Sequence, residues 1–241
     1  MPTPAPNSAV PRTDAPLQAV LWDMDGTLVD TEPYWIEAEK ALVTQHGGTW
    51  SDEDALQLVG NALDKSALLL QEAGVAMSVP EIIDWLTAQV IERTKAHIPW
   101  RPGARELIDE LYAAGIPSAL VTMSFTELAK IVQDALGPGR LEFIVTGDQV
   151  SNGKPHPEAY LTALDRLAKS HGPLEPRRVV AIEDSFPGVS SAIASGVLTI
   201  AIPHTVPLPE HLGDLQWTTL AGKRVADLES AIDALGNVDP S

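Results

Sequence analysis

The sequence predicts an α/β protein built on a doubly wound parallel sheet, with a helical segment inserted after the first strand. From residue 100 onward, short apolar runs rich in β-branched residues alternate with helical patterns, which is the arrangement that builds parallel sheets. A similar apolar run, 19–22, stands far upstream. The block between them, about 34–97, has apolar residues three or four apart and no convincing strand. The block therefore reads as a helical insertion.

The first strand is expected over residues 19–22, which are followed at once by Asp23, Met24, Asp25 and Gly26. A short apolar run that ends in turn residues is typical of a buried parallel strand. Side chains alternate along an extended chain, so Asp23 and Asp25 would point the same way. Two carboxylates about 4 Å apart repel by roughly 4 kcal/mol at an effective dielectric near 20, so a cation or a shared proton is needed. Mg²⁺ suits carboxylate and carbonyl oxygens best.

Two other interpretations of this segment compete with a metal site. Asp and Gly are common in turns, so the pair could end a strand without any chemistry. The pattern D-x-D-G also resembles a calcium-binding EF-hand loop, but that loop has its glycine at the sixth position and follows a helix. Gly26 is fourth and follows an apolar run, so the EF-hand is rejected.

The remaining elements follow in order along the chain. Helices are expected in the inserted block at 33–45, 51–59, 64–73 and 80–97. Ser78 and Glu81 have the spacing of a capping box for the last of them. Further strands are expected at 116–121, 143–146, 179–182 and 198–202, and helices at 104–114, 127–136, 157–171 and 188–195. The predicted division is a tail (1–16), a core (17–33 and 98–241) and a helical cap (34–97).

Composition limits the classes of function. The chain has 241 residues, of which 44% are hydrophobic, enough for one large core with an inserted module. Its formal net charge of −17 argues against nucleic acid or an anionic membrane as a partner. There is no cysteine, which excludes disulfides, thiolate metal sites and thiol catalysis. Residues 1–16 are Pro-rich and lack the pattern of a signal peptide, so we expect a disordered tail and a cytoplasmic protein.

Polar residues follow four of the predicted strands. Asp23 follows the first, Thr122 the second, and Lys154 lies in the loop after 143–146, while Glu183 and Asp184 follow 179–182. In doubly wound sheets, ligands bind outside the carboxyl ends of the strands. Each residue has a plainer explanation by itself: a strand end, an exposed loop lysine, or a helix cap. Their joint placement favours one site.

These residues make the chain similar to capped members of the haloacid dehalogenase-like superfamily. The resemblance lies in DMDGT at 23–27, the VTMS segment that contains Thr122, GKP around Lys154, and ED at 183–184. It implies a Rossmann-like core with a small helical cap, and phosphoryl transfer with Mg²⁺ through a phosphoaspartate. The position of the insertion most resembles that of β-phosphoglucomutases and small sugar-phosphate phosphatases.

The resemblance also implies roles for the two aspartates and the phosphate-binding groups. Asp23 would be the nucleophile, which is already ionised at neutral pH because a carboxyl has a pKa near 3.9. Asp25 would protonate the leaving alkoxide and then take a proton from water. Thr122, the backbone amide of Met24 and Lys154 would hold the phosphate oxygens.

For the metal, the resemblance implies that Asp184 binds Mg²⁺ directly and Glu183 more indirectly, through water. The Asp23 carboxylate and the Asp25 carbonyl would complete the protein ligands.

Several nearby residues are expected to have structural roles. Ser124 and Glu127 have the spacing to cap the helix after Thr122. His156 is expected to have a loop or capping role. Trp35 and Trp85 fall on apolar helical faces and are expected to pack inside the cap. Arg101 is expected in a solvated linker, with substrate contact as the alternative.

The inserted block decides between hydrolysis and isomerisation. The resemblance implies that mutases carry a histidine ten residues after the acid/base aspartate and an arginine three residues after a cap glycine, where this chain has Trp35 and Leu63. A mutase also needs a second phosphate site, and Lys65 is the only nearby cation in that segment.

We therefore predict a phosphatase for a small phosphorylated metabolite such as a sugar or polyol phosphate. A β-phosphoglucomutase-type phosphomutase is the alternative, and a non-catalytic phosphate- or metal-binding module is a weaker one. Dehalogenation is disfavoured by Asp25, because a halide leaves without protonation. The sequence leaves the oligomeric state open.

Overall fold

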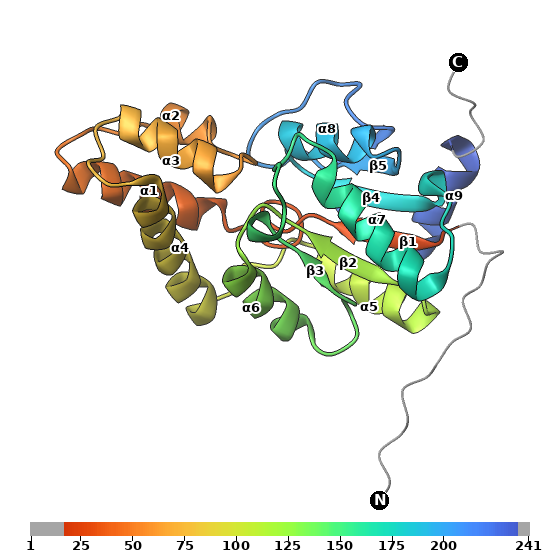
Figure 1. Ribbon diagram of the computed structural model, residues 1–241. Helices are drawn as coiled ribbons and strands as arrows, with labels where there is room; N and C mark the ends of the chain where they lie inside the picture. Colours follow the sequence, from red (N-terminus) through yellow and green to blue (C-terminus); the bar gives the residue numbers. More distant parts are fainter. Residues whose placement is uncertain (1–16, 236–241) are drawn as a thin grey trace, which may run out of the picture.

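The computed structural model describes residues 17–235, so the predicted tail at 1–16 lies outside the described residues. Within these residues a six-stranded parallel sheet has the order β3-β2-β1-β4-β5-β6 (Figure 1). Its strands are β1 (Ala19–Trp22), β2 (Ser118–Val121), β3 (Ile144–Val145), β4 (Val179–Glu183), β5 (Leu198–Ala201) and β6 (Leu215–Gln216). The predicted doubly wound α/β fold is confirmed.

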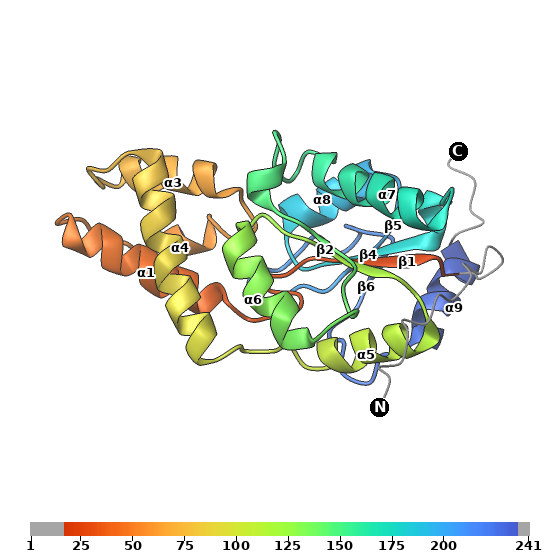
Figure 2. The same cartoon turned by 60° about the horizontal axis from the view of Figure 1, so that its bottom comes forward.

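Helices cover both faces of the sheet, as Figure 2 shows. One face carries α5 (Ala104–Ala114), α6 (Thr126–Leu136) and α9 (Val225–Leu235), and the other carries α7 (Glu158–His171) and α8 (Phe186–Ala194). Two short 3₁₀ turns, η1 (Gly147–Gln149) and η2 (Pro176–Arg178), connect elements. Alternate residues of β1 join the two apolar clusters, because successive strand side chains point to opposite faces.

The inserted block forms four helices that lie to one side of the sheet (Figure 1). They are α1 (Glu32–Gln45), α2 (Asp52–Leu56), α3 (Leu63–Glu72) and α4 (Val79–Ala96). The predicted capping box is present, with the Glu81 carboxylate accepting from the backbone N–H of Ser78 at 2.8 Å. Apolar residues of this insertion join the same cluster as the α5 face of the sheet, and α4 packs against α6.

Some element boundaries differ from the predictions. β2 begins at Ser118 rather than at 116, which agrees with the lack of an N–H on Pro117. β6 and α9 were not predicted.

The expected cap of α6 is wrong: its N-cap is Phe125, and the Asp148 carboxylate accepts from the Thr126 N–H at 3.1 Å instead. Ser185 caps α8, because its hydroxyl accepts from Gly188 N at 3.2 Å. Glu183 and Asp184 therefore do not cap this helix.

The topology places a reversal point beside β1. The chain runs from β1 outward to β3 and then returns to β4 on the other side of β1. Ligands of such sheets bind at the carboxyl ends of the strands that flank this point. Among the helices of residues 17–235, none is long and apolar enough to cross a membrane.

Candidate active site

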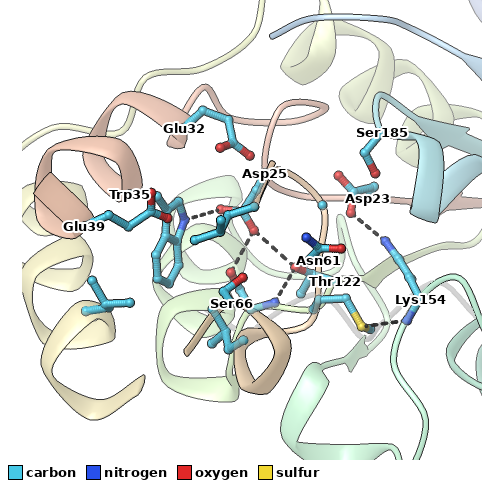
Figure 3. Close-up of a pocket in the computed structure, with 16 residues that line it drawn as sticks. Asp23, Asp25, Glu32, Trp35, Glu39, Asn61, Ser66, Thr122, Lys154 and Ser185 are labelled. Atoms are coloured by element: carbon cyan, nitrogen blue, oxygen red, sulfur yellow. Dashed lines mark hydrogen bonds and ion pairs between the residues drawn. The ribbon is translucent and has the colours of Figure 1, made fainter. Parts of the chain in front are cut away.

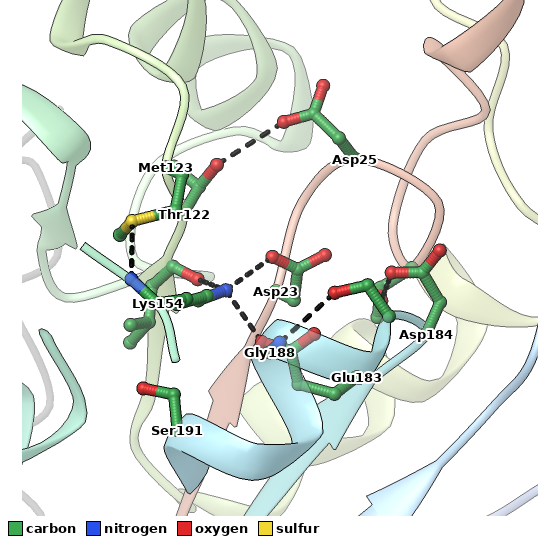
Figure 4. Close-up of polar contacts among 12 residues, drawn as sticks. Asp23, Asp25, Thr122, Met123, Lys154, Glu183, Asp184, Gly188 and Ser191 are labelled. Carbon is green, nitrogen blue, oxygen red and sulfur yellow. Dashed lines mark hydrogen bonds and ion pairs between the residues drawn. The ribbon is translucent and has the colours of Figure 1, made fainter. Parts of the chain in front are cut away.

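A buried lysine joins the ends of three strands. Lys154 Nζ lies 2.6 Å from Asp23 Oδ1 and 2.6 Å from Glu183 Oε1, and donates to the backbone oxygen of Val121 at 2.9 Å (Figure 4). All three charged side chains are buried. Burial by itself would lower the pKa of Lys154, but the combined attraction of the Asp23 and Glu183 carboxylates is the larger effect, so the pKa is raised. The lysine is therefore a fixed positive charge next to Asp23.

Asp23, Glu183 and Asp184 form a buried acidic cluster whose carboxylate oxygens lie within 4.8 Å of one another. Burial and then Glu183 raise the pKa of Asp23 to about 7, although Lys154 opposes the shift. Burial and then Asp23 also raise the pKa of Asp184. Within residues 17–235, Asp23 Oδ2 and Glu183 Oε2 are buried without a hydrogen-bond partner. An all-oxygen cluster with excess negative charge and free oxygens fits a divalent metal ion.

Two glycines make room for these carboxylates. A Cβ on Gly26, whose φ is +87°, would lie 2.0 Å from Asp184 Oδ2. A Cβ on Gly188 would lie 1.9 Å from Glu183 Oε2. Since no side chain tolerates such contacts, glycine at both positions lets the backbone approach the acids closely. The DMDGT and ED segments are therefore fitted to each other.

Asp25 is held by a separate set of neutral donors. Its carboxylate accepts hydrogen bonds from the hydroxyls of Thr31, Thr122 (3.3 Å) and Ser124 (2.8 Å), and from Trp35 Nε1 (3.2 Å). Figure 3 shows the contacts with Trp35 and Thr122. These donors come from the start of α1 and from the loop after β2. The contacts fix the Asp25 carboxyl at the wall of a pocket that Asp23, two positions earlier in the sequence, also lines.

The structure brings the sequence-predicted site residues together at one edge of the sheet. Asp23, Asp25, Thr122 and Lys154 line one pocket, and Glu183 and Asp184 lie beside it in the acidic cluster. The Met24 N–H has no acceptor among the backbone hydrogen bonds of residues 17–235, so it is available to a ligand. The expected capping role of Ser124 is wrong because the N-cap of α6 is Phe125, and the Ser124 hydroxyl donates to Asp25 instead.

Two other expectations concern residues near the site. His156 Nδ1 accepts from the N–H of Glu158, the first residue of α7, at 3.2 Å, which agrees with the expected capping role. Arg101 Nη1 lies 3.3 Å from His204 Nε2, and Arg101 does not line the pocket.

The pocket lies between the helical insertion and the sheet edge and has a volume of about 60 Å³. Among the described residues that line it, Lys154 is the only cation. Its lining from the insertion is made of Glu32, Trp35, Glu39, Leu58, Gly60, Asn61, Leu63, Ser66 and Leu86.

A model of the family described as haloacid dehalogenase-like hydrolase matches residues 20–202, which include every predicted site residue. The chain belongs to this family. The sequence resemblance stated above is thereby confirmed.

Other members of the haloacid dehalogenase-like family match over most of the chain. A phosphorylated carbohydrates phosphatase of Thermotoga maritima is 31% identical over 75% of this chain and 82% of its own length. Hexitol phosphatase A of Escherichia coli is 32% identical over 76% of this chain and 81% of its own. The crystal structure of CbbY from Rhodobacter sphaeroides in complex with phosphate matches with a TM-score of 0.78 at 25% identity, over 88% of this chain and 99% of that one.

Sequence reasoning missed three pocket residues of this family member. Trp35 packs in the apolar core as expected, but its indole N–H also bonds to Asp25. Glu32 and Glu39 are buried and line the pocket. The missed signal is spacing: residues 32, 35 and 39 are three and four apart, which places them on one face of α1.

Proposed function

We propose that this haloacid dehalogenase-like hydrolase is a Mg²⁺-dependent phosphatase that hydrolyses a small phosphorylated metabolite through a phosphoaspartate on Asp23. One observation carries the proposal: Asp25 is fixed by four donors at the wall of a pocket, two residues from an aspartate that is paired with a buried lysine. The names of the relatives, which include phosphatases of carbohydrate and hexitol phosphates, support the same activity.

The reaction needs two proton transfers that use the same group. Asp23 Oδ attacks phosphorus, and the breaking P–O bond leaves its electron pair on an alkoxide, which takes a proton from Asp25. Asp25, now a carboxylate, takes a proton from the water that attacks the phosphoaspartate. Phosphate leaves, and both aspartates return to their starting state. The donors from Thr31, Ser124 and Trp35 keep the Asp25 carboxyl at the pocket wall in both steps, while the Thr122 hydroxyl turns from Asp25 to the phosphate.

The remaining residues bind the phosphate and the metal. Lys154, the Thr122 hydroxyl and the Met24 N–H hold phosphate oxygens. Asp184 would hold Mg²⁺ directly and Glu183 through water, with the Asp23 carboxylate and the Asp25 carbonyl. When bound, the ion would offset the repulsion between the anionic substrate and Asp23 and would stabilise charge on the equatorial oxygens.

The helical insertion is proposed to act as a cap, with 34–97 as the cap domain and 17–33 and 98–241 as the core domain. Ligand pockets commonly measure about 300–1,000 Å³, whereas this one measures about 60 Å³. A metabolite therefore enters only after the insertion and the core move apart, as in enzymes whose lids exclude water. The cytoplasmic location expected from the sequence stays a prediction.

A phosphomutase is the second candidate, because the β-phosphoglucomutase of Clostridium difficile has the same fold, with a TM-score of 0.77. A mutase must hold the second phosphate group of a bisphosphate intermediate while that intermediate reorients in the site. Lys65 is the cation of the inserted segment that could bind this phosphate according to the sequence. It is exposed and donates to Asn61 Oδ1 at 2.9 Å. Hydrolysis requires only that water reach the phosphoaspartate before a second sugar hydroxyl does.

The test is a phosphate-release screen over phosphorylated metabolites with Mg²⁺ and with EDTA. An assay for conversion of glucose 1-phosphate to glucose 6-phosphate, with catalytic bisphosphate, runs beside it. We expect Mg²⁺-dependent phosphate release from at least one monoester and from p-nitrophenyl phosphate. Isomerisation without net phosphate release would assign the mutase function, and inactivity towards every phosphate ester would favour a binding module.

A further inference from the structure

The end of the pocket away from Lys154 is acidic, which the phosphatase mechanism above does not use. In Figure 3, Glu39 and Trp35 lie on the side of Asp25 away from the Asp23–Lys154 pair. Glu32 and Glu39 are only 7% and 5% exposed, and both line the pocket. Burying two carboxyl groups in one cavity is costly unless they find partners. Their placement therefore calls for a ligand group.

The protein itself leaves most of their hydrogen-bonding capacity unused. Within residues 17–235, the only hydrogen bond to the Glu39 carboxyl comes from Trp50 Nε1, which donates to Oε2 at 3.3 Å. No hydrogen bond or ion pair to the Glu32 carboxyl is found in the same part of the chain. Ser66 is also buried in the pocket wall with no partner for its hydroxyl among these residues. Buried polar groups that lack partners and face a cavity are positions where a ligand can complete the hydrogen bonds.

The surroundings of these groups indicate what the ligand is. Leu58, Leu63 and Leu86 supply apolar surface among the carboxyl and hydroxyl groups, a mixture that suits a carbon chain bearing hydroxyls. No described Lys or Arg lines this end of the pocket, so a second phosphate or a carboxylate would find no cation there to offset its loss of water.

Resting on the phosphatase function proposed above, we propose that Glu39, supported by Glu32, hydrogen-bonds hydroxyl groups of a polyhydroxylated monophosphate and excludes substrates that carry a second anionic group. Trp50 is a positioning residue in this proposal, because its indole N–H orients the Glu39 carboxyl without lining the pocket.

The protonation state of Glu39 favours a hydroxyl over an ammonium as its partner. Burial raises the pKa of Glu39 to about 8, although the Trp50 hydrogen bond opposes the shift. At neutral pH the carboxyl is then largely uncharged, and it can both donate to and accept from a substrate hydroxyl. An uncharged acid offers little attraction to a cation.

The experiment compares three substrates with the full chain and Mg²⁺: sorbitol 6-phosphate, p-nitrophenyl phosphate, which has no hydroxyl, and fructose 1,6-bisphosphate. Glu39→Leu should lower kcat/KM for sorbitol 6-phosphate by about 10- to 100-fold, mainly through KM, because a buried hydroxyl loses its partner. It should leave kcat/KM for p-nitrophenyl phosphate within about 3-fold. Glu39→Gln, which keeps a donor and an acceptor, should lose less than Glu39→Leu.

Two further variants separate recognition from a structural role. Glu37→Leu is the matched control, because Glu37 is an exposed acid of the same helix that pairs with Arg93 outside the pocket; it should leave both substrates unaffected. Trp50→Phe should lower turnover of sorbitol 6-phosphate several-fold and spare p-nitrophenyl phosphate. It keeps the test decisive if Glu39→Leu does not fold.

The results that overturn the proposal are specific. Equal losses on the two monoesters would show a structural role, and no loss on either would show that Glu39 does not touch the substrate. Bisphosphate hydrolysis as efficient as that of sorbitol 6-phosphate, or a preference for glucosamine 6-phosphate over glucose 6-phosphate, would also contradict it. If the wild-type chain fails to hydrolyse even p-nitrophenyl phosphate, the phosphatase function itself fails, which is a different outcome.

Discussion

Asp23 and Asp25 are two residues apart, yet the fold gives them different surroundings. Asp23 is buried beside two acids and one lysine, so its charge depends on the cations around it. Asp25 is half-buried and receives four neutral hydrogen bonds. The first arrangement suits a nucleophile that is neutralised by positive charge, and the second suits a group that gives and takes a proton.

Asp23→Asn should abolish turnover, with kcat reduced by at least about 10⁴-fold. The amide is a poor nucleophile, while the shape of the side chain is retained. The melting temperature without metal should stay the same or rise, because the substitution removes an acid whose pKa burial and Glu183 have raised. Steady-state phosphate release and circular dichroism melting measure the two effects. Activity near that of the wild type would refute the nucleophile assignment.

Asp25→Asn should separate the two chemical steps. p-Nitrophenolate leaves without a proton, so phosphoaspartate formation from p-nitrophenyl phosphate should continue. Its hydrolysis should stall because no base activates water. Rapid-quench kinetics should show a burst of about one nitrophenol per enzyme, followed by very slow turnover. Normal steady-state turnover of an alkyl phosphate by this variant would contradict the acid/base role.

Glu39 should make the stability of the protein depend on pH. Its pKa is about 8 in the folded state, against 4.5 in the unfolded chain. The folded state prefers the protonated form, so this stabilisation is full below the unfolded pKa and is lost as pH rises through the folded pKa. Between pH 5 and 8.5, the melting temperature of Glu39→Gln should therefore gain at least ~4 °C relative to wild type. A constant difference between the two proteins would show that Glu39 does not titrate in this range.

At the scale of elements, the contact between the insertion and the core depends on a glycine. Gly60 follows α2 with a φ of +74°, and a Cβ there would lie 2.5 Å from Ser185 Oγ at the start of α8. The same loop approaches the core a second time, because a Cβ on Gly153 would lie 2.8 Å from that of Ala62. These contacts close the pocket over the site.

Gly60→Ala should hold the insertion away from Ser185 and lower kcat/KM by about 10-fold, because closure excludes water and completes the site. Gly47→Ala is the matched control: its φ is +80°, and a Cβ there meets nothing within 4 Å. Both variants should lose about 1 kcal/mol of stability from the backbone conformation. Initial-rate kinetics distinguish them, and equal activities of the two variants would argue against closure at Gly60.

At the scale of the whole molecule, charge opposes the proposed substrate. The chain carries a formal net charge of −17, and a phosphate monoester is an anion. Long-range repulsion slows the encounter, and salt screens it. Local cations then have to hold the phosphate once it arrives, which agrees with the position of Lys154 beside Asp23.

Raising the ionic strength from about 10 mM to about 300 mM at saturating Mg²⁺ should increase kcat/KM about 2- to 10-fold and leave kcat unchanged. The effect should be the same with sodium and tetramethylammonium chlorides, since screening depends on charge alone. A decrease in kcat/KM with salt would mean that the field at the pocket mouth is positive.

The sheet and the placement of the site residues could be predicted because they depend on local pattern and topology. Parallel strands end at one edge, so residues that follow them, such as Asp23, Thr122 and Asp184, must meet there. β6 was missed because a two-residue strand carries no periodicity. The final helix has apolar residues at positions 225, 228 and 232, a spacing that was sufficient to predict it.

The side-chain partners around the site could not be read from the sequence in the same way. Ser124 had the spacing of a cap, but α6 begins at Thr126 with Phe125 as its N-cap, and the Ser124 hydroxyl donates to the Asp25 carboxylate at 2.8 Å. Trp35 was assigned to packing because its apolar surface does pack, and only the direction of its N–H shows the contact with Asp25. Glu39 reads as a surface charge until the helices around it are placed.

The central claim is that the Asp23 carboxylate attacks phosphorus beside a metal ion and the Lys154 ammonium. A crystal structure of the protein with Mg²⁺ and beryllium fluoride tests it most directly. We expect a trifluoroberyllate group bonded to an Asp23 carboxylate oxygen, with Mg²⁺ at Asp184 and a fluoride facing Lys154. Beryllium fluoride bound elsewhere, with the Asp23 carboxylate unmodified, would contradict the account.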